Sequence, residues 1–405
     1  MRFARFGFVL ALCGSLTAAA AAQEASKEKP FFDLRGHEPA YVGPPGARLT
    51  PDDVTEVRIG YFGPADPNHP LYGNLWTAAQ RAVEDANRAG GFHGKPFRLL
   101  SAWSDNPWGN GITQVTQLVY RDRVWAIVGG VDGPTTHLAE QVVVKARLPL
   151  VSPLSTDESV NLTNISWMFS LAPSDACVAE TLLGALSQPD DSAPLALLSM
   201  NDHDARKLAD AVRKVLDEHH CAPRNQFEFE PKSEAHDQLV RECLSRNPSQ
   251  IILIADAAES AELVNRLRQN GFAGRIVGSP ACGRSLFIAR VGDLAGDVVF
   301  PMIHQLPATP PTTERHSDTQ LSVPAVAEQP FTSRDYAALH VYDAVHLVTR
   351  AIQTAGLQRP AIAEALRAAS PTQGLSGPIE WNRPGTNTRK PRLATLRAGQ
   401  IQPWP

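Results

Sequence analysis

The sequence predicts an α/β protein of two Rossmann-like lobes, each a doubly wound unit with a parallel central sheet. Its 405 residues are enough for two domains of ordinary size. Short apolar runs alternate with segments of helical periodicity in two successive series, at about residues 54–170 and 173–278. Since a helix connects almost every pair of consecutive strands, we expect parallel sheets with right-handed crossovers.

The first series begins with the apolar run 57–62, a strand that Gly63-Pro64 ends. The segment 73–89 carries small and apolar residues on one helical face, and Gly90-Gly91 terminates it. The same patterns predict strands at 96–101, 126–130, 150–151 and 164–170, helices at 112–121 and 137–147, and a loop at 102–111.

The second series starts after Pro173-Ser174-Asp175 and repeats the alternation of helix and strand. It predicts helices at 176–187, 205–219, 235–246 and 258–270, and strands at 195–199, 226–229, 251–255 and 275–278. Residues 304–331 are rich in Pro, Thr, Ser and Gln and have no clear period, so we expect a loop. Helices at 333–355 and 359–369 and strands at 377–381 and 392–397 complete the chain.

The first 22 residues have the pattern of a secretory signal peptide. Arg2 and Arg5 form a basic start, the apolar run 6–16 is too short to span a bilayer, and 18–22 offers an A-x-A cleavage site. A lipoprotein anchor at Cys13 is disfavoured because Leu12 is not small. We therefore expect a periplasmic protein. Residues 23–53 form an irregular N-terminal extension that either wraps the first lobe or acts as a flexible tether.

Composition and motifs exclude several functional classes. A net charge of −4 gives no basic surface for nucleic acid. The chain has no G-x-S-x-G, H-E-x-x-H, Walker A or G-x-G-x-x-G motif, so no enzyme activity is expected. Export permits disulfides, and four cysteines remain after cleavage of the signal peptide. They allow either disulfide pairs in one of three arrangements or buried free thiols: Cys177, Cys221, Cys243 and Cys282.

Two polar turns follow neighbouring strands of the first series. One is Gly133-Pro134-Thr135-Thr136, and the other runs from Ser152 to Thr156. Both fall at carboxyl ends of predicted parallel strands, where open α/β sheets bind ligands. They offer hydroxyl and backbone N–H groups rather than a strong acid, base or metal ligand, so they indicate a site that holds a small polar molecule without converting it. The same hydroxyls also suit helix caps.

The order and spacing of six motifs resemble one family, the type I periplasmic solute-binding proteins, in their leucine/isoleucine/valine-binding-like branch. The motifs are Ile59-Gly60-Tyr61-Phe62-Gly63-Pro64, Tyr72-Gly73, the helix 78–91 ending in NRAGG, Val128-Gly129-Gly130, Pro149-Leu150-Val151-Ser152-Pro153, and the run 336–344. The resemblance implies two lobes joined by three chain crossings, with a ligand in the cleft and hinge closure around it. It places lobe I at 54–171 and 303–375, and lobe II at 172–302 and 376–405.

The resemblance also implies which residues contact the ligand. The two polar turns of lobe I would grip its carboxylate and amino group, and Tyr72 would cover it. Backbone N–H groups and hydroxyls suit a carboxylate because they donate several hydrogen bonds without a buried countercharge. The contacts implied in the two turns are Thr135, Thr136, Leu154, Ser155 and Thr156. Family members of this kind deliver the ligand to an ABC-type permease and act as monomers.

Lobe II departs from the family pattern. The aromatic-glycine pair expected after the strand 195–199 is replaced by Asp202-His203-Asp204. Asp256 ends a later strand, and Glu259 lies near the position of an acid that holds an amino group. These acids favour an amine-bearing, cationic or hydroxyl-rich ligand over a branched-chain amino acid. Aromatic surface from Trp103 and Trp108 is a further candidate contact. No cofactor or metal is expected, because His203 and the pair His219-His220 are interpreted as helix ends. The alternative function is a ligand sensor or partner protein that uses the same fold without transport.

Overall fold

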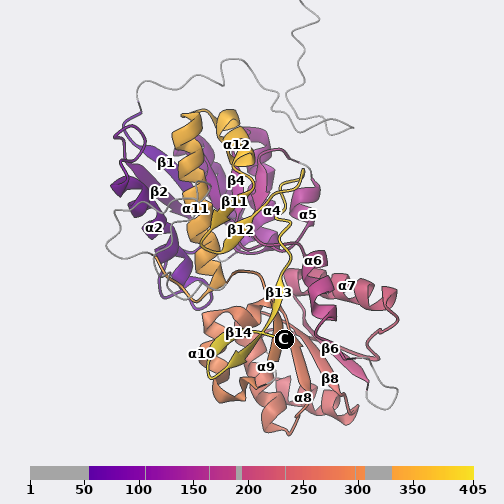
Figure 1. Ribbon diagram of the computed structural model, residues 1–405. Coiled ribbons are helices and arrows are strands. Elements are labelled where there is room, and N and C mark those ends of the chain that lie inside the picture. Colours follow the sequence, from indigo (N-terminus) through magenta and orange to yellow (C-terminus); the bar gives the residue numbers. More distant parts are fainter. Residues whose placement is uncertain are drawn as a thin grey trace, which may run out of the picture.

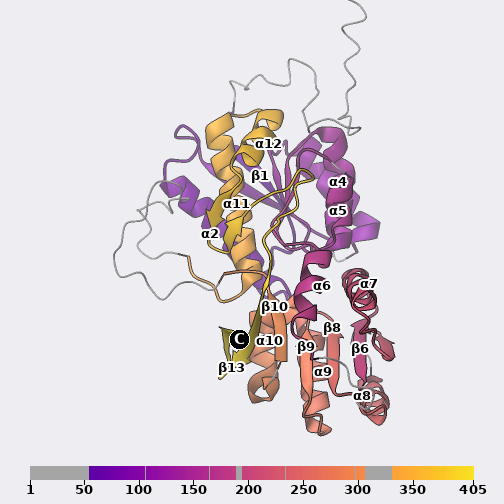
Figure 2. The ribbon, with the colours of Figure 1, turned by 45° about the vertical axis from the view of Figure 1, so that its right-hand side comes forward.

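The computed structural model describes residues 54–104, 106–163, 165–187, 194–232, 234–296, 298–305 and 331–405. The predicted signal peptide, the extension 23–53 and residues 306–330 of the predicted loop lie outside this part of the chain. The described chain forms two lobes, one above the other, each with a central sheet flanked by helices (Figure 1). In Figure 2 the yellow C-terminal segment can be followed from the upper lobe down to β13 (Arg392–Arg397) in the lower one.

The first lobe is built on a five-stranded parallel sheet in the order β2-β1-β3-β4-β5. Apolar residues cover both faces of this sheet and form two separate cores. The strands are β1 (Val57–Phe62), β2 (Phe97–Ala102), β3 (Ile127–Gly129), β4 (Leu150–Ser152) and β5 (Met168–Ser170). The helices include α2 (Gly73–Arg88), α4 (Gly133–Ala146), α5 (Ser159–Leu162), α11 (Tyr336–Ala355) and α12 (Arg359–Ala368).

The second lobe has a seven-stranded sheet in the order β14-β13-β10-β9-β8-β6-β7. Five strands are parallel: β6 (Leu195–Met200), β7 (Asn225–Phe229), β8 (Gln250–Ile254), β9 (Arg275–Gly278) and β10 (Val298–Met302). The antiparallel strands β13 (Arg392–Arg397) and β14 (Gln400–Pro403) extend one edge. Its α-helices are α6 (Asp175–Leu183), α7 (His203–Glu218), α8 (His236–Ser245), α9 (Ala257–Gln269) and α10 (Ser285–Val291). The predicted α/β class with two lobes is confirmed.

Several helices begin earlier or later than the sequence patterns predict. The helix expected at 137 begins at Gly133, because the Asp132 carboxylate accepts a hydrogen bond from the Thr135 N–H at 2.8 Å. Asp202 in the same way starts α7 at His203. The predicted loop 102–111 was wrong at its end, where a π-helical turn, η2 (Pro107–Gly111), precedes α3 (Ile112–Thr116) and the π-helical turn η3 (Gln117–Arg121).

Three chain segments pass between the lobes and bond to one another. The Asn387 amide on the last crossing donates to the Leu171 carbonyl on the first, at 2.7 Å. The Arg389 guanidinium donates to the carbonyl of Ser376, at 2.6 Å, and to that of Ile303 on the second crossing. Trp381 packs on Phe169 in the first core, whereas β13 belongs to the second sheet. We propose that the last boundary between lobes lies nearer Arg389 than residue 376.

Two further expectations concern cysteines and membranes. The four described cysteines are free thiols, as the alternative without disulfides expects. They are Cys177, Cys221, Cys243 and Cys282. Cys243 and Cys282 are buried, and burial raises the pKa of each thiol, to about 11 and about 12. Among the described residues, no helix has both the length and the apolar character needed to span a bilayer.

Candidate functional site

A cavity of about 310 Å³ lies between the two lobes, at the carboxyl ends of their strands. Loops after β3 and β4 supply its upper wall, and loops after β6, β8 and β9 supply its lower wall. This is the position that parallel α/β sheets use for ligands. Apolar side chains line much of it: Leu71, Val131, Leu154, Met200, Leu208, Ile254 and Leu286.

Four aspartates line this cavity: Asp132, Asp202, Asp204 and Asp256. Three of them cap helices. Asp132 caps α4, Asp202 caps α7 through the Ala205 N–H at 3.0 Å, and Asp256 caps α9 through two N–H groups. Burial raises the pKa of the Asp132, Asp202 and Asp204 carboxyls, and in Asp204 the neighbouring Asp132 adds to it. The cavity wall is therefore rich in carboxyl oxygens that can accept hydrogen bonds.

Arg284 is the permanently cationic side chain among the described residues that line the cavity. It is buried, and its guanidinium Nε lies 2.7 Å from the Asp335 carboxylate, which also caps α11. Its Nη2 donates to the Leu71 carbonyl at 2.9 Å, and the group lies over the Tyr336 ring. Arg284 thus joins the second lobe to two segments of the first while it forms part of the cavity wall.

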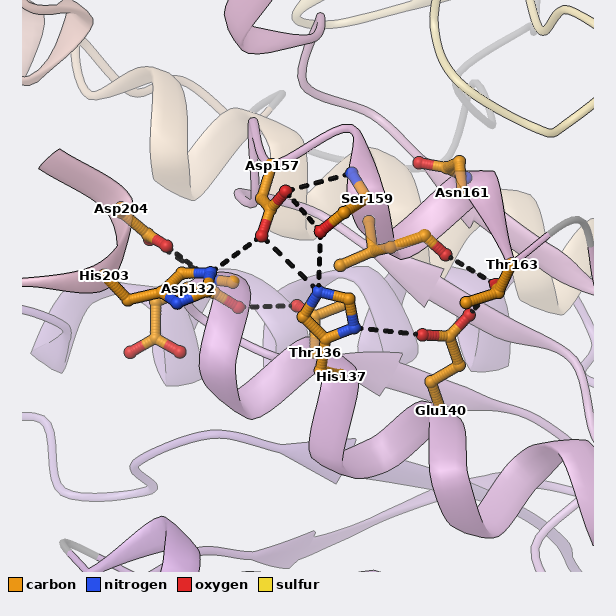
Figure 3. A network of polar contacts seen from close by, with 12 residues as sticks. Asp132, Thr136, His137, Glu140, Asp157, Ser159, Asn161, Thr163, His203 and Asp204 are labelled. Carbon is orange, nitrogen blue, oxygen red and sulfur yellow. Dashed lines mark hydrogen bonds and ion pairs between the residues drawn. The ribbon is translucent and has the colours of Figure 1, made fainter. Parts of the chain in front are cut away.

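The start of α7 contacts the first lobe at the rim of the cavity. The Gly133 N–H of α4 donates to both carboxylate oxygens of Asp204, at 3.0 and 3.1 Å. Beside it, His203 Nε2 lies 2.8 Å from Asp157 Oδ2 in the first lobe (Figure 3). Both contacts depend on the lobes being close together. Together they join the two lobes whose loops form the cavity walls.

Asp157 is the centre of a polar cluster at this contact (Figure 3). Its Oδ1 accepts from the Ser159 N–H and hydroxyl, at 2.9 and 2.6 Å. His137 Nε2 lies 3.4 Å from Oδ2, and His137 Nδ1 lies 3.3 Å from Glu140. Hydrogen bonds to Asp157 and Glu140 raise the pKa of His137 to about 9. Burial opposes ionisation of Asp157, but hydrogen bonds from His137, Ser159 and His203 outweigh it and lower its pKa.

Six of the predicted ligand contacts line the cavity: Tyr72, Leu154, Thr156, Asp202, Asp204 and Asp256. Tyr72 stacks on His69, with ring centroids 5.3 Å apart. The imidazole Nδ1 of His69 in turn accepts the Tyr72 N–H at 3.2 Å. The structure therefore brings together one turn of the first lobe, the covering aromatic and the acids of the second lobe. Contact of these residues with a ligand remains a prediction.

The other candidates lie outside the lining of this cavity. Thr135 and Thr136 are fully buried, and their hydroxyls bond within the Asp132 loop, as the helix-cap alternative expects. The Ser155 hydroxyl is buried and has no hydrogen-bond partner among the described residues. Glu259 accepts the Lys232 N–H at 2.9 Å. Trp103 packs on Phe62, and Trp108 is 68% exposed. Ligand contact at these positions also stays a prediction.

Sequence reasoning missed several residues of the site. Asp132 had a usable signal, because Asp just before a segment with Pro and helical periodicity is a common start of a helix. Tyr336 belongs to one of the six motifs but had no role assigned, and Arg284 and the pair His137–Asp157 had no signal. Their importance comes from contacts between distant segments, such as Arg284 with Asp335. Such contacts leave no local pattern in the chain.

The fold agrees with the comparisons to known proteins. A family model described as periplasmic binding protein matches residues 56–400, so the chain belongs to the periplasmic binding protein family. An amino acid binding protein of Pseudomonas aeruginosa is 22% identical over 349 residues, covering 83% of this chain and 89% of the relative. The fold is thus that of type I periplasmic binding proteins, with relatives among the leucine/isoleucine/valine-binding-like branch.

Solved structures show the same architecture. The branched-chain amino acid binding protein LivJ of Streptococcus pneumoniae, in complex with isoleucine, has a TM-score of 0.69 and 19% identity, over 86% of this chain and 98% of its own. The leucine binding protein LivK of Thermotoga maritima gives 0.71 and 17% over the same shares. A solute binding protein of R. palustris in complex with benzoate gives 0.68 and 12%, over 86% and 95%. At these identities the likeness establishes the fold and not the ligand.

Proposed function

We propose that this protein captures a small, amine-bearing polar ligand outside the cytoplasm and delivers it to an ABC importer. It acts in the periplasm as a monomer and releases the ligand unchanged. The observation that carries the proposal is the cavity between the lobes, which four carboxylates and one buried guanidinium line. A related amino acid binding protein and a neighbouring structure with bound isoleucine support an amino-acid-like ligand.

The chemistry of the walls sets the class of ligand. A volume of about 310 Å³ suits a small molecule at the lower end of the usual range of binding sites. Asp202 and Asp256 belong to the lower wall, and an ammonium group between them would reduce their mutual repulsion. Thr156 and Leu154 belong to the opposite wall, where the family resemblance places the grip on the ligand's carboxylate. A ligand with an amine and a carboxylate would bridge the two walls.

Binding by closure explains why the site is divided between the lobes. The bond from Gly133 to Asp204 and the contact of His203 with Asp157 form only when α7 approaches the first lobe. A ligand that touches both walls binds this arrangement better than a separated one, so it shifts the population toward closure. Hydrogen bonds link the three crossings to one another, and the lobes would turn about these crossings as rigid bodies.

Replacement of Gly133 by Ala tests closure with little disturbance of either lobe. A Cβ at this position would lie 2.5 Å from Asp204 Oδ1 and 3.0 Å from His203 Cδ2, so it would hold the lobes apart. Gly133 is the first residue of α4, and alanine favours helix. We expect Gly133→Ala to weaken ligand binding at least tenfold, or about 1.4 kcal/mol, in calorimetry.

The matched control is Gly296→Ala, since a Cβ there meets nothing within 4 Å. This variant should bind as the wild type does. The unfolding free energy of ligand-free Gly133→Ala should stay close to that of the wild type, because the two shortest contacts of the added Cβ are with the other lobe and the contact within its own lobe, with Asp157 Oδ2, is longer, at 3.2 Å. Unchanged affinity of Gly133→Ala would contradict binding by closure of this cleft.

A further inference from the structure

His137, Asp157 and His203 converge at the contact between the lobes, beside the cavity (Figure 3). One potential ligand atom from each residue lies within 4.8 Å of the other two. His137 and Asp157 belong to the first lobe, and His203 begins α7 of the second. Two imidazoles and one carboxylate are a donor set that zinc sites use, with a water in the fourth position.

The distances suit a tetrahedral ion after small side-chain movements. Asp157 Oδ2 lies 2.8 Å from His203 Nε2 and 3.4 Å from His137 Nε2. With bonds of about 2.0–2.1 Å, the ligand atoms of a tetrahedral zinc site stand roughly 3.3 Å apart. The contact with His203 would lengthen, and the two imidazole nitrogens, which lie within 4.8 Å of each other, would approach by at most about 1.5 Å.

In Asp157 and His137, the polar atoms that would not bind the ion are held by other groups. Asp157 Oδ1 is occupied by the Ser159 N–H and hydroxyl, which leaves Oδ2 to face the two imidazoles. His137 Nδ1 faces Glu140, whose other oxygen accepts from the Thr163 hydroxyl. A carboxylate on the far nitrogen of a histidine is the usual support of a metal ligand, because it fixes the tautomer and the ring. The Ser159 hydroxyl also lies 2.9 Å from His137 Nε2 and would give way to the ion.

The cluster is open to solvent on one side. The His137 and His203 side chains are 26% and 34% exposed, whereas Asp157 is buried. An ion can therefore enter, and a water can complete its coordination. Two imidazoles select against Mg²⁺ and Ca²⁺, which prefer oxygen ligands, and favour Zn²⁺ and similar transition metals.

We propose that His137, Asp157 and His203 bind one divalent transition-metal ion of the zinc class and thereby fasten the two lobes together. The ion would bind the closed arrangement, because His203 joins the other two ligands only there. By linkage, metal and captured solute would each raise the affinity for the other. The site uses none of the groups assigned to the amine, so it stands whether or not the proposed solute is correct.

Calorimetric titration of the full mature chain with Zn²⁺ alone tests this site, in metal-free buffer and without a histidine tag. We expect one ion per chain, no binding of Mg²⁺, and at least about 100-fold weaker binding by His137→Ala/His203→Ala. Loss of an outer-shell partner alone costs 10- to 100-fold, so loss of two ligands costs at least as much. The control His219→Gln/His220→Asn removes two exposed histidines elsewhere and should bind like the wild type.

Three results would overturn the site: no binding of Zn²⁺ by the wild type, equal binding by the cluster variant, or loss of binding in the control alone. The absorption spectrum of the Co²⁺ form of the wild-type protein gives an answer that depends on no variant. Ligation by imidazole and carboxylate predicts no thiolate charge-transfer band. Such a band would assign the ion to a cysteine such as Cys221 and exclude this cluster.

Discussion

Replacement of Arg284 by Ala should lower the free energy of unfolding by about 3–5 kcal/mol, the usual cost of leaving one partner of a buried ion pair unpaired. Asp335 would be left at 2% exposure without its guanidinium partner. Burial alone would lower the pKa of Arg284, but Asp335 outweighs it and raises that pKa, so the pair is ionised. The bond from Arg284 to the Leu71 carbonyl would also be lost. Urea denaturation at neutral pH measures the change.

A surface arginine gives the matched control. Arg266 pairs with Asp237 and Glu262 on the exposed side of α9, where ion pairs contribute roughly 0–1 kcal/mol. Arg266→Ala should therefore cost less than about 1 kcal/mol. If Arg284→Ala costs no more than Arg266→Ala, the buried pair does not hold the lobes and the cavity wall together as described.

Acidification should destabilise the protein through His340, which is fully buried between Pro153 and the second crossing. Its Nδ1 lies 3.0 Å from the Pro153 carbonyl, and the Arg389 guanidinium lies 3.4 Å from its Nε2. Burial, with Arg389 beside it, lowers the pKa of His340 to about 3. Above pH 6.5, His340 is neutral in both the folded and the unfolded chain. Between pH 6.5 and about 3, it takes up a proton only in the unfolded chain. Stability is thus lost progressively as the pH falls from 6.5 toward 3.

The free energy of unfolding that is lost through His340 is expected to reach about 3 kcal/mol at pH 4.5, which is two pH units below 6.5. The free energy of unfolding, measured by denaturation at pH 7 and at pH 4.5, should therefore fall less between these pH values in His340→Gln than in the wild type. The two falls should differ by about that amount. His219→Gln, at an exposed helix end, serves as the control and should follow the wild type. If His340→Gln loses as much unfolding free energy between pH 7 and pH 4.5 as the wild type does, His340 is not held neutral in the folded protein.

Most of the fold could be predicted from the sequence because its strands are buried runs between helices. Val57–Phe62 and Arg275–Gly278 have the same bounds in the prediction and in the structure. Helix starts were less accurate, since a single capping side chain decides them. Asp132 and Asp335 set the first residues of α4 and α11 and lie outside the apolar periodicity that predicts helices.

The site could be predicted only in part. Motif positions lead to Tyr72, Thr156 and the acids after β6 and β8, because loops at carboxyl ends of strands converge. The Thr135 and Thr136 hydroxyls suit a ligand or a helix cap equally in sequence, and the structure shows the cap bonds. Arg284 and the cluster around Asp157 depend on how the two lobes meet. That arrangement is a property of tertiary packing and is absent from local patterns.

The most direct test of the central claim is a thermal-shift screen of wild type and Gly133→Ala against amino acids, small amines, short carboxylic acids and polyols. A ligand at about 100 times its dissociation constant stabilises by about 2.7 kcal/mol, which is readily detected. The cavity between the lobes predicts that an amine-bearing compound raises the Tm of the wild type, and raises that of Gly133→Ala clearly less. A shift caused only by compounds without an amine, an equal shift in both proteins, or none at all would contradict it.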